Sequence, residues 1–302
     1  MSLLVIGSVA FDAIETPFGK TDKIIGGAAS YISLSASYFV KPVNLVAVVG
    51  GDFPQEYINS IQSKGVDITG LQIKKEEKSF FWSGKYNYDL NSRDTLITEL
   101  NVLGDFDPII PDSYQDCEYL MLGNLSPDIQ LKVLERLTHR PKLVVLDTMN
   151  FWMDIAMDSL LKIISKVDVL SINDEEARQL SGEYQLKKAA QKIMQLGLRY
   201  LIIKKGEHGA ILFHEDKSFY VPALLLDQVF DPTGAGDTFA GGFIGYIAGQ
   251  GKTDFETLKK ALVYGSAMAS FCVEKFGTEN LLELNQEMID ARFQQFRVMV
   301  EF

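Results

Sequence analysis

Runs of consecutive apolar residues alternate along the chain with segments whose apolar residues have helical spacing. A strand in a sheet that is covered on both faces has no solvent-facing positions, so all its residues are apolar. Each run therefore predicts a central strand. The runs cover residues 3–6, 45–49, 119–122, 143–146, 169–172 and 200–203, and the helical segments between them cover 28–39, 54–64, 127–138, 174–180 and 186–196. Strands that alternate with helices predict an α/β fold, a three-layer α/β/α sandwich with a mainly parallel sheet.

Two segments have a different pattern. Residues 11–25 and 79–98 mix aromatic and polar side chains in near alternation, with Gly and Asn at the turns. This pattern is typical of partly exposed antiparallel strands, so we expect a small sheet beside the main one. The last third of the chain is predicted to be mostly helical, over 237–248, 255–273 and 285–296. Because there is no internal repeat and no Pro/Ser linker, we expect a single domain over residues 1–302.

Composition narrows the choice of partners. The 302 residues include 29 Lys and Arg against 40 Asp and Glu, which gives a net charge of −11. This charge disfavours nucleic acid and anionic membranes as principal partners. Cys117 and Cys272 have no close Cys or His partner that would indicate a metal site, and such low cysteine usage fits a reducing cytoplasm. No run of about 18 apolar residues occurs, so we expect no membrane-spanning helix.

Two familiar nucleotide motifs are incomplete. The Gly-Lys-Thr sequence at 251–253 resembles the end of a P-loop, but Tyr246 stands where that loop requires its first glycine. The Gly-x-Gly sequence at 234–236 resembles the start of a dinucleotide fingerprint, but Phe239 replaces the third glycine. The three histidines fall in no motif, which disfavours a Ser-His-Asp hydrolase.

The most informative segment is 231–239, which we call the glycine segment. In it a turn-rich sequence leads directly into an apolar helix. The amides of Gly234, Ala235 and Gly236 would be free at the helix N-terminus and would form an anion hole. Asp237 would then lie where a phosphoryl group arrives and could accept a proton from an attacking hydroxyl. The alternative interpretation is that Asp237 is an acidic N-cap of a glycine-rich helix.

This segment resembles the C-terminal signature of the PfkB, or ribokinase-like, carbohydrate kinases, and the resemblance extends over the full length. It implies ATP-dependent phosphorylation of a hydroxymethyl group on a sugar or sugar-like substrate, with Asp237 as general base and Gly234 to Gly236 as the anion hole. Asp231 and Thr233 resemble the family's monovalent cation loop, which implies a potassium site, and Thr233 also belongs to the nucleotide side.

The same resemblance implies a nucleotide and magnesium site. Asn173 and Glu176 fit the family's N-x-x-E motif, whose residues organise water-bound Mg²⁺ and the phosphates. An amide and a carboxylate at the C-terminal edge of a parallel sheet are suitable partners for this ion. Lys204, Gly206 and Gly209 are similar to the nucleotide-side turn, in which a small polar residue often stands at the position of Lys204.

The substrate side of the resemblance lies near the N-terminus. Gly26 and Gly27 open a helix as in the family's first signature, and Asp12 matches the acid that holds substrate hydroxyls. Tyr31 occupies a position where the family frequently has Asn. The segment 147–152 also departs from the usual D-P-N-x-R sequence. These departures make a nucleoside kinase of the same fold the alternative to the sugar kinase.

The segments 11–25 and 79–98 lie where the family carries its lid, a small β-sheet that folds over the substrate and excludes water. A surface hairpin is the alternative interpretation, and the resemblance favours the lid. A homodimer through the exposed face of this lid is compatible with the resemblance. A catalytically silent ligand-binding regulator is the third hypothesis, which the combination of Asp237, the glycine segment and the N-x-x-E motif disfavours.

Overall fold

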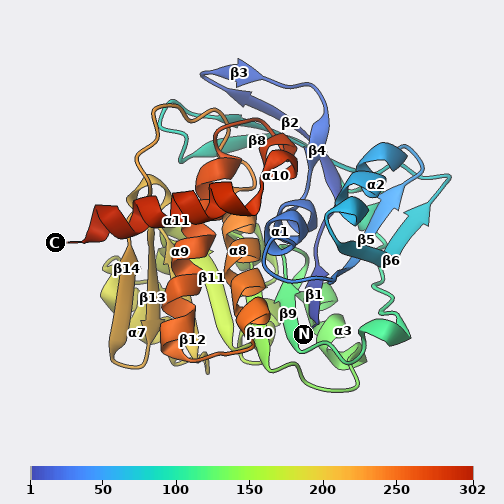
Figure 1. Ribbon diagram of the computed structural model, residues 1–302. Helices are drawn as coiled ribbons and strands as arrows, with labels where there is room; N and C mark the ends of the chain where they lie inside the picture. Colours follow the sequence, from blue (N-terminus) through green and yellow to red (C-terminus); the bar gives the residue numbers. More distant parts are fainter. Residues whose placement is uncertain (1, 302) are drawn as a thin grey trace.

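The computed structural model describes residues 2–301 and places a large sheet between two layers of helices (Figure 1). Within these residues the sheet has nine strands in the order β14-β13-β12-β11-β10-β9-β1-β5-β6. The strands are β1 Leu3–Ile6, β5 Val43–Gly50, β6 Val66–Lys74, β9 Tyr119–Leu122, β10 Leu143–Asp147, β11 Val169–Asn173, β12 Tyr200–Lys204, β13 Ala210–His214 and β14 Lys217–Val221. The strands from β12 to β6 pair in parallel, whereas β13 and β14 continue one edge in antiparallel orientation. The predicted mainly parallel sheet is confirmed.

Helices cover both faces of this sheet (Figure 1). One layer contains α1 Ala28–Ala36, α2 Gln55–Ser63, α8 Ala235–Gln250, α9 Phe255–Cys272, α10 Glu279–Glu283 and α11 Gln286–Val300. The other layer contains α3 Pro127–Arg136, α4 Asn150–Ile155, α5 Met157–Ile164, α6 Asp174–Ser181 and α7 Leu186–Met194. The chain therefore forms the predicted three-layer sandwich.

The apolar runs are buried because successive residues of a strand face the two helix layers in turn. Leu3 and Val5 pack with the α1 and α8 side, whereas Leu4 and Ile6 pack with the α3 and α5 side. All four side chains are fully buried. A strand in this position has no solvent-facing side, which explains why its sequence has no alternation.

A second, smaller sheet lies at the C-terminal ends of the parallel strands (Figure 1). We call it the small sheet, and it comprises β2 Ala10–Thr16, β3 Gly19–Lys20, β4 Ile24–Gly26, β7 Phe80–Tyr86 and β8 Arg93–Glu99. Strands β7 and β8 pair in antiparallel orientation, as predicted for 79–98. Strands β2 and β7 pair in parallel, because the chain crosses the main sheet between them. No helix within residues 2–301 is long and apolar enough to cross a membrane.

Candidate active site

Three polar residues lie at the C-terminal ends of adjacent parallel strands, and two of them are predicted site residues. Asp147, Asn173 and Lys204 are the last residues of β10, β11 and β12. Asn173 and Lys204 are paired in the sheet register, and Asp147 pairs with Ser171. Parallel strands end at one edge of the sheet, so residues far apart in sequence meet there.

The glycine segment forms the N-terminus of α8 beside this edge. Gly234 is the N-cap residue of the helix, with φ of 74°. A Cβ atom on Gly234 would lie 2.4 Å from the ring of Tyr31, so only glycine fits this turn. A Cβ atom on Gly236 would lie 3.1 Å from Nζ of Lys204, which places the ammonium group against the segment.

The amides of this turn differ from the prediction in one respect. The Ala235 amide donates a hydrogen bond of 3.1 Å to the carbonyl of Pro232, so it is not free. This bond closes the tight turn from which the helix starts. Within residues 2–301, the amides of Gly234 and Gly236 have no hydrogen-bond partner. Two of the three predicted donors are therefore free in the structure, and their role as an anion hole stays a prediction.

Asp237 is the third residue of α8, and Gly234 rather than Asp237 caps the helix. The interpretation of Asp237 as an N-cap is thus wrong, because the turn places the cap three residues earlier. Burial and the negative charge of Asp147 raise the pKa of Asp237 to about 7, whereas Lys204 and Arg93 act in the opposite direction. A carboxyl group with such a pKa is well suited to accept a proton near neutral pH.

Asn173 and Glu176 form the N-terminal capping box of α6. Oδ1 of Asn173 accepts a hydrogen bond of 2.7 Å from the amide of Glu176, and Oε2 of Glu176 accepts one of 2.8 Å from the amide of Asn173. Burial raises the pKa of Glu176 to about 7. No cluster of three or more potential metal ligands exists within residues 2–301. An amide and a carboxylate oxygen held in this way are suitable partners for an ion bound through water, and their role toward Mg²⁺ stays a prediction.

Asp12, Gly26 and Gly27 lie together where β2, β4 and α1 meet. A Cβ atom on Gly26 would lie 1.8 Å from Oδ2 of Asp12, so the carboxylate packs directly on the glycine backbone. Gly27 has φ of 88°, and its Cβ atom would lie 2.6 Å from the carbonyl oxygen of Ser8. Asp12 is 5% exposed, and burial together with the negative charge of Asp231 raises its pKa to about 7.

Tyr31 lies beneath the glycine segment and is 1% exposed. Its ring contacts Gly234, as described above, and burial raises the pKa of its hydroxyl well above the usual value. This hydroxyl is buried and has no hydrogen-bond partner within residues 2–301. The contact between Tyr31 and substrate stays a prediction, since the structure gives the ring a packing role beneath the glycine segment.

Asp231 is a buried carboxylate at the start of the glycine segment. Its Oδ1 accepts a hydrogen bond of 2.8 Å from the amide of Thr233, and its Oδ2 accepts one of 3.3 Å from the amide of Gly277. It has no ion pair with a basic side chain in the described part of the chain, although it is 1% exposed. An anionic group that is buried without a cationic partner is a suitable ligand for a bound cation.

Gly206 and Gly209 flank the short 3₁₀ turn that follows β12. Their φ values are 54° and 89°, and a Cβ atom on Gly209 would lie 2.0 Å from the carbonyl oxygen of Val221. Both glycines are thus required by the backbone of this turn. A Cβ atom on Gly206 would lie 2.6 Å from Oδ1 of Asn91, so the tip of the β7–β8 hairpin reaches the turn.

Two hydrogen bonds also join the small sheet to the glycine segment and to the residue that precedes it. Thr233 donates a bond of 3.1 Å from Oγ1 to the hydroxyl of Tyr86 on β7. Thr16 on β2 donates a bond of 3.1 Å to the carbonyl of Phe230. The small sheet therefore lies over the edge at which the acidic residues, Lys204 and the glycine segment meet.

Comparison with known proteins assigns this arrangement to a family. The family model described as pfkB family carbohydrate kinase matches residues 2–285. This chain belongs to the pfkB family. The kinase is 34% identical to the cytidine kinase of Thermococcus kodakarensis over 258 residues, which cover 83% of this chain and 90% of that protein. The predictions of the family, the ribokinase-like fold and a phosphotransferase are confirmed.

Solved structures agree with the fold of the kinase. The nucleoside kinase of Methanocaldococcus jannaschii superposes with a TM-score of 0.77 at 22% identity and covers 97% of this chain and 98% of its own. A putative ribokinase II from E. coli, solved in complex with ATP and Mg²⁺, gives a TM-score of 0.80 at 21% identity and covers 97% and 99% of the two chains.

Arg93 is a residue of the kinase that the sequence analysis missed. It is the first residue of β8, pairs with Tyr86 in the register, and lies 5.8 Å from the ring centroid of Trp82. Its positive charge opposes the rise in the pKa values of Asp12, Glu176 and Asp237. Nothing in the local sequence distinguishes it from other charged residues of an exposed hairpin, so only the tertiary structure reveals its place.

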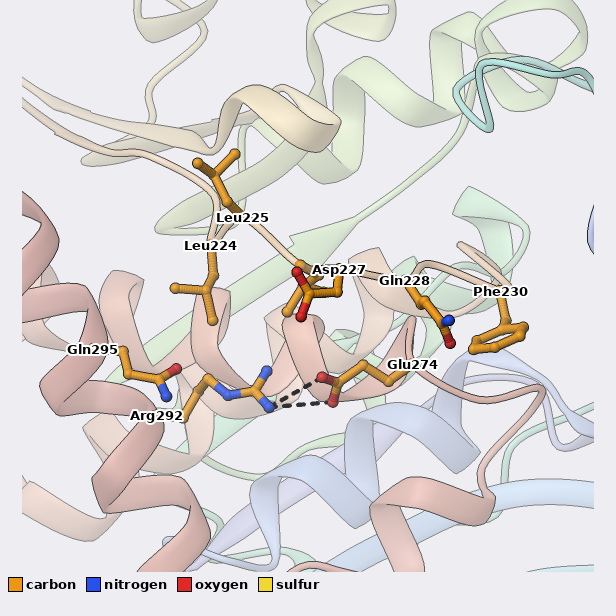
Figure 2. A pocket seen from close by; sticks show the side chains of 9 residues that line it. Leu224, Leu225, Asp227, Gln228, Phe230, Glu274, Arg292 and Gln295 are labelled. Carbon is orange, nitrogen blue, oxygen red and sulfur yellow. Dashed lines mark hydrogen bonds and ion pairs between the residues drawn. The ribbon is translucent and has the colours of Figure 1, made fainter.

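A recess with a volume of about 720 Å³ lies outside this cluster of the kinase. Figure 2 shows the irregular segment 224–228 on one side and the ion pair of Arg292 with Glu274 on the other, and the atoms of this pair are 3.2 Å apart. Phe230, the neighbour of Asp231, closes one end. None of the predicted site residues lines this recess.

Proposed function

We propose that the kinase transfers the γ-phosphate of ATP to the hydroxymethyl group of a nucleoside, with cytidine as the first candidate. The observation that carries the proposal is the position of Asp237, one residue after the free Gly236 amide and with a pKa near 7. The identity of 34% to a cytidine kinase supports a nucleoside more strongly than a free sugar. Sugars remain the second substrate class, because a carboxylate such as Asp12 suits any pair of vicinal hydroxyls.

In this proposal Asp237 accepts the proton of the substrate hydroxyl as its oxygen attacks the γ-phosphorus. The amides of Gly234 and Gly236 donate hydrogen bonds to the phosphoryl oxygens, where negative charge is redistributed during transfer. The N-terminus of α8 adds a favourable electrostatic field for the same oxygens. Groups that are fixed before the reaction starts need no reorganisation during it, which makes them effective.

The substrate would lie between Asp12 and the glycine pair. Asp12 would accept hydrogen bonds from two ribose hydroxyls, and the absence of side chains at Gly26 and Gly27 would let the sugar approach the backbone. We propose that the small sheet acts as the lid of this site. Its bonds to the glycine segment, through Tyr86 and Thr16, would then exclude water from the reacting phosphate.

ATP would lie along the turn formed by Gly206 and Gly209, with its phosphates toward Lys204 and the glycine segment. Asn173 and Glu176 would hold Mg²⁺ through water molecules. Magnesium, when bound, neutralises charge on the β- and γ-phosphates. The buried capping box keeps both side chains in fixed orientations, which favours a defined arrangement of such water molecules.

A monovalent cation site is proposed at Asp231 and Thr233. The fit rests on the buried carboxylate of Asp231, which has no basic partner in the described residues. Potassium there would stabilise the loop that carries the anion hole. We expect kcat to fall when potassium chloride is replaced by tetramethylammonium chloride at equal ionic strength, whereas an unchanged kcat would exclude an activating site.

A homodimer through the small sheet is proposed from the exposed apolar residues of that sheet and its flanks. Exposed apolar patches of this kind commonly mark interfaces. They are Phe18, Tyr88, Leu96, Ile97 and Leu100. Light scattering of the purified protein should give twice the chain mass, and a monomer at all concentrations would contradict the proposal.

The substrate proposal is tested by the rate of ADP release with Mg-ATP over a panel of cytidine, uridine, adenosine, inosine, ribose and common hexoses. We expect kcat/KM for cytidine to exceed that for every sugar by at least about tenfold, equivalent to about 1.4 kcal/mol of transition-state binding. An Asp12→Asn variant should lose turnover of the preferred substrate and serves as the control. A sugar that is turned over faster than every nucleoside would contradict the nucleoside assignment.

The pH dependence follows from the carboxyl groups. Asp237 can accept a proton only when it is ionised, and its raised pKa places this ionisation at about 7. We therefore expect kcat/KM to rise as the pH increases through about 7 and to fall in acid, where Asp237 is protonated. Asp12 ionises in the same range and would steepen the acidic limb. A constant kcat/KM between about pH 5 and 9 would contradict this role of Asp237.

A further inference from the structure

Lys204 is held at the end of β12 with its ammonium group between Asp147 and the glycine segment. Nζ of Lys204 lies 2.7 Å from Oδ2 of Asp147, and the two side chains are 17% and 8% exposed. On its other side the ammonium group borders Gly236, where a Cβ atom would lie 3.1 Å away. The ion pair is thus part of the wall against which a phosphoryl group would rest.

The ammonium group has unused hydrogen-bonding capacity. A lysine has three N–H donors, and Lys204 donates within residues 2–301 only to Asp147. Burial lowers the pKa of Lys204, but the charges of Asp147, Glu176 and Asp237 outweigh it and keep the group protonated. A largely buried cation with free donors beside two free amides is arranged to receive a second anion.

We propose that Lys204 is a catalytic residue that donates hydrogen bonds to the transferring phosphoryl group, and that Asp147 is its positioning residue. This inference rests on the proposed phosphoryl transfer at Asp237. As the substrate oxygen bonds to the γ-phosphorus, the bond from phosphorus to the β–γ bridging oxygen breaks and ADP leaves. The substrate proton passes to Asp237, and Lys204 stays protonated throughout, so its contribution is electrostatic.

The location of Asp147 explains why a partner is needed. Without it, the ammonium group would be drawn toward the two other carboxylates whose charges act on it, Glu176 and Asp237. A direct pair with Asp237 would occupy both the proton acceptor and the place of the phosphate. Asp147 and Lys204 end β10 and β12, on either side of β11, so the rigid sheet fixes the direction of the pair.

The variants must not leave a buried charge without its partner. Lys204→Met alone leaves Asp147 without its cation, and such a change destabilises a fold for reasons unrelated to catalysis. The double variant Lys204→Met/Asp147→Asn removes both charges. Asp147→Asn alone keeps the cation but loses its anchor. Lys205→Met is the matched control, because Lys205 follows directly in the chain and its Nζ lies over the ring of Tyr220 at 5.8 Å.

Turnover and nucleotide affinity are measured for each variant, with melting temperature as the check on folding. We expect the double variant to lose kcat by about 100-fold. We expect Lys205→Met to stay within about twofold of wild type. Asp147→Asn should lose about tenfold in kcat because its lysine is present but poorly directed. A double variant that is folded and turns over at the wild-type rate would overturn the proposal.

Calorimetric binding of Mg-AMP-PNP and Mg-ADP separates a phosphoryl contact from a general effect. The double variant should bind Mg-AMP-PNP about tenfold more weakly and Mg-ADP almost unchanged, since only the former has a γ-phosphoryl group. Equal losses for both nucleotides, or none, would overturn the proposal. These titrations need no acceptor, so they decide on Lys204 even if the wild-type kinase fails to phosphorylate any nucleoside, which would refute the proposed substrate alone.

Discussion

Asp237→Asn is expected to lower kcat by about 1000-fold, because the amide keeps the shape of the carboxylate but does not accept the substrate proton. The helix should be unaffected, since Gly234 provides the cap and Asp237 lies in the first turn. KM for ATP should change little, because the proposed phosphate contacts come from the backbone and Lys204. Coupled ADP release at saturating substrate measures the loss.

Asp227→Asn is the matched control for this result. Asp227 lies ten positions earlier, on the exposed segment that lines the recess in Figure 2, and it belongs to no proposed contact with substrate. Its kcat should remain within about twofold of wild type. If Asp237→Asn retained more than about a tenth of the wild-type kcat, Asp237 would not be the general base.

Gly234→Ala is the second large effect expected. Alanine at φ of 74° costs about 1–2 kcal/mol in backbone strain, and its Cβ atom would lie 2.4 Å from the buried ring of Tyr31. Because that ring is enclosed, the turn must shift and carry its amides away from the phosphoryl position. We expect kcat to fall by about 100-fold, comparable to the loss of a donor in an oxyanion hole.

Gly182→Ala separates strain from displacement of the turn. Gly182 ends α6 with φ of 71°, close to that of Gly234, but its Cβ atom would have no neighbour nearer than 3.9 Å. We expect a lower thermal stability for both variants and an unchanged kcat for Gly182→Ala. An equal loss of kcat in the two variants would mean that the anion hole does not depend on the Gly234 turn.

The central strands could be predicted because burial on both faces leaves a continuous apolar run. Most helices could be predicted because their apolar residues have helical spacing. The edge strands were missed for the opposite reason. The segment of β13 and β14 is half exposed at one edge, and β6 at the other edge also carries exposed residues. Helices α4 and α5 were not predicted either, since both are short and only one residue separates them.

The candidate site was predictable where the backbone dictates the residue type. Gly27, Gly234 and Gly209 have positive φ values, and a side chain at any of them would collide with neighbouring atoms. The bond from Ala235 to Pro232 was not predictable, because it depends on the pitch of the turn. The pairing of Asp147 with Lys204 joins strands separated by β11, and no spacing in the sequence indicates it.

Product analysis of a reaction with cytidine and Mg-ATP tests the central claim most directly. Phosphorus NMR of the mixture follows ADP and the phosphorylated nucleoside together. We predict that the two form in equal amounts and that the new phosphate is esterified to the hydroxymethyl oxygen of the ribose. Formation of ADP with free phosphate and without a phosphorylated nucleoside would contradict the claim.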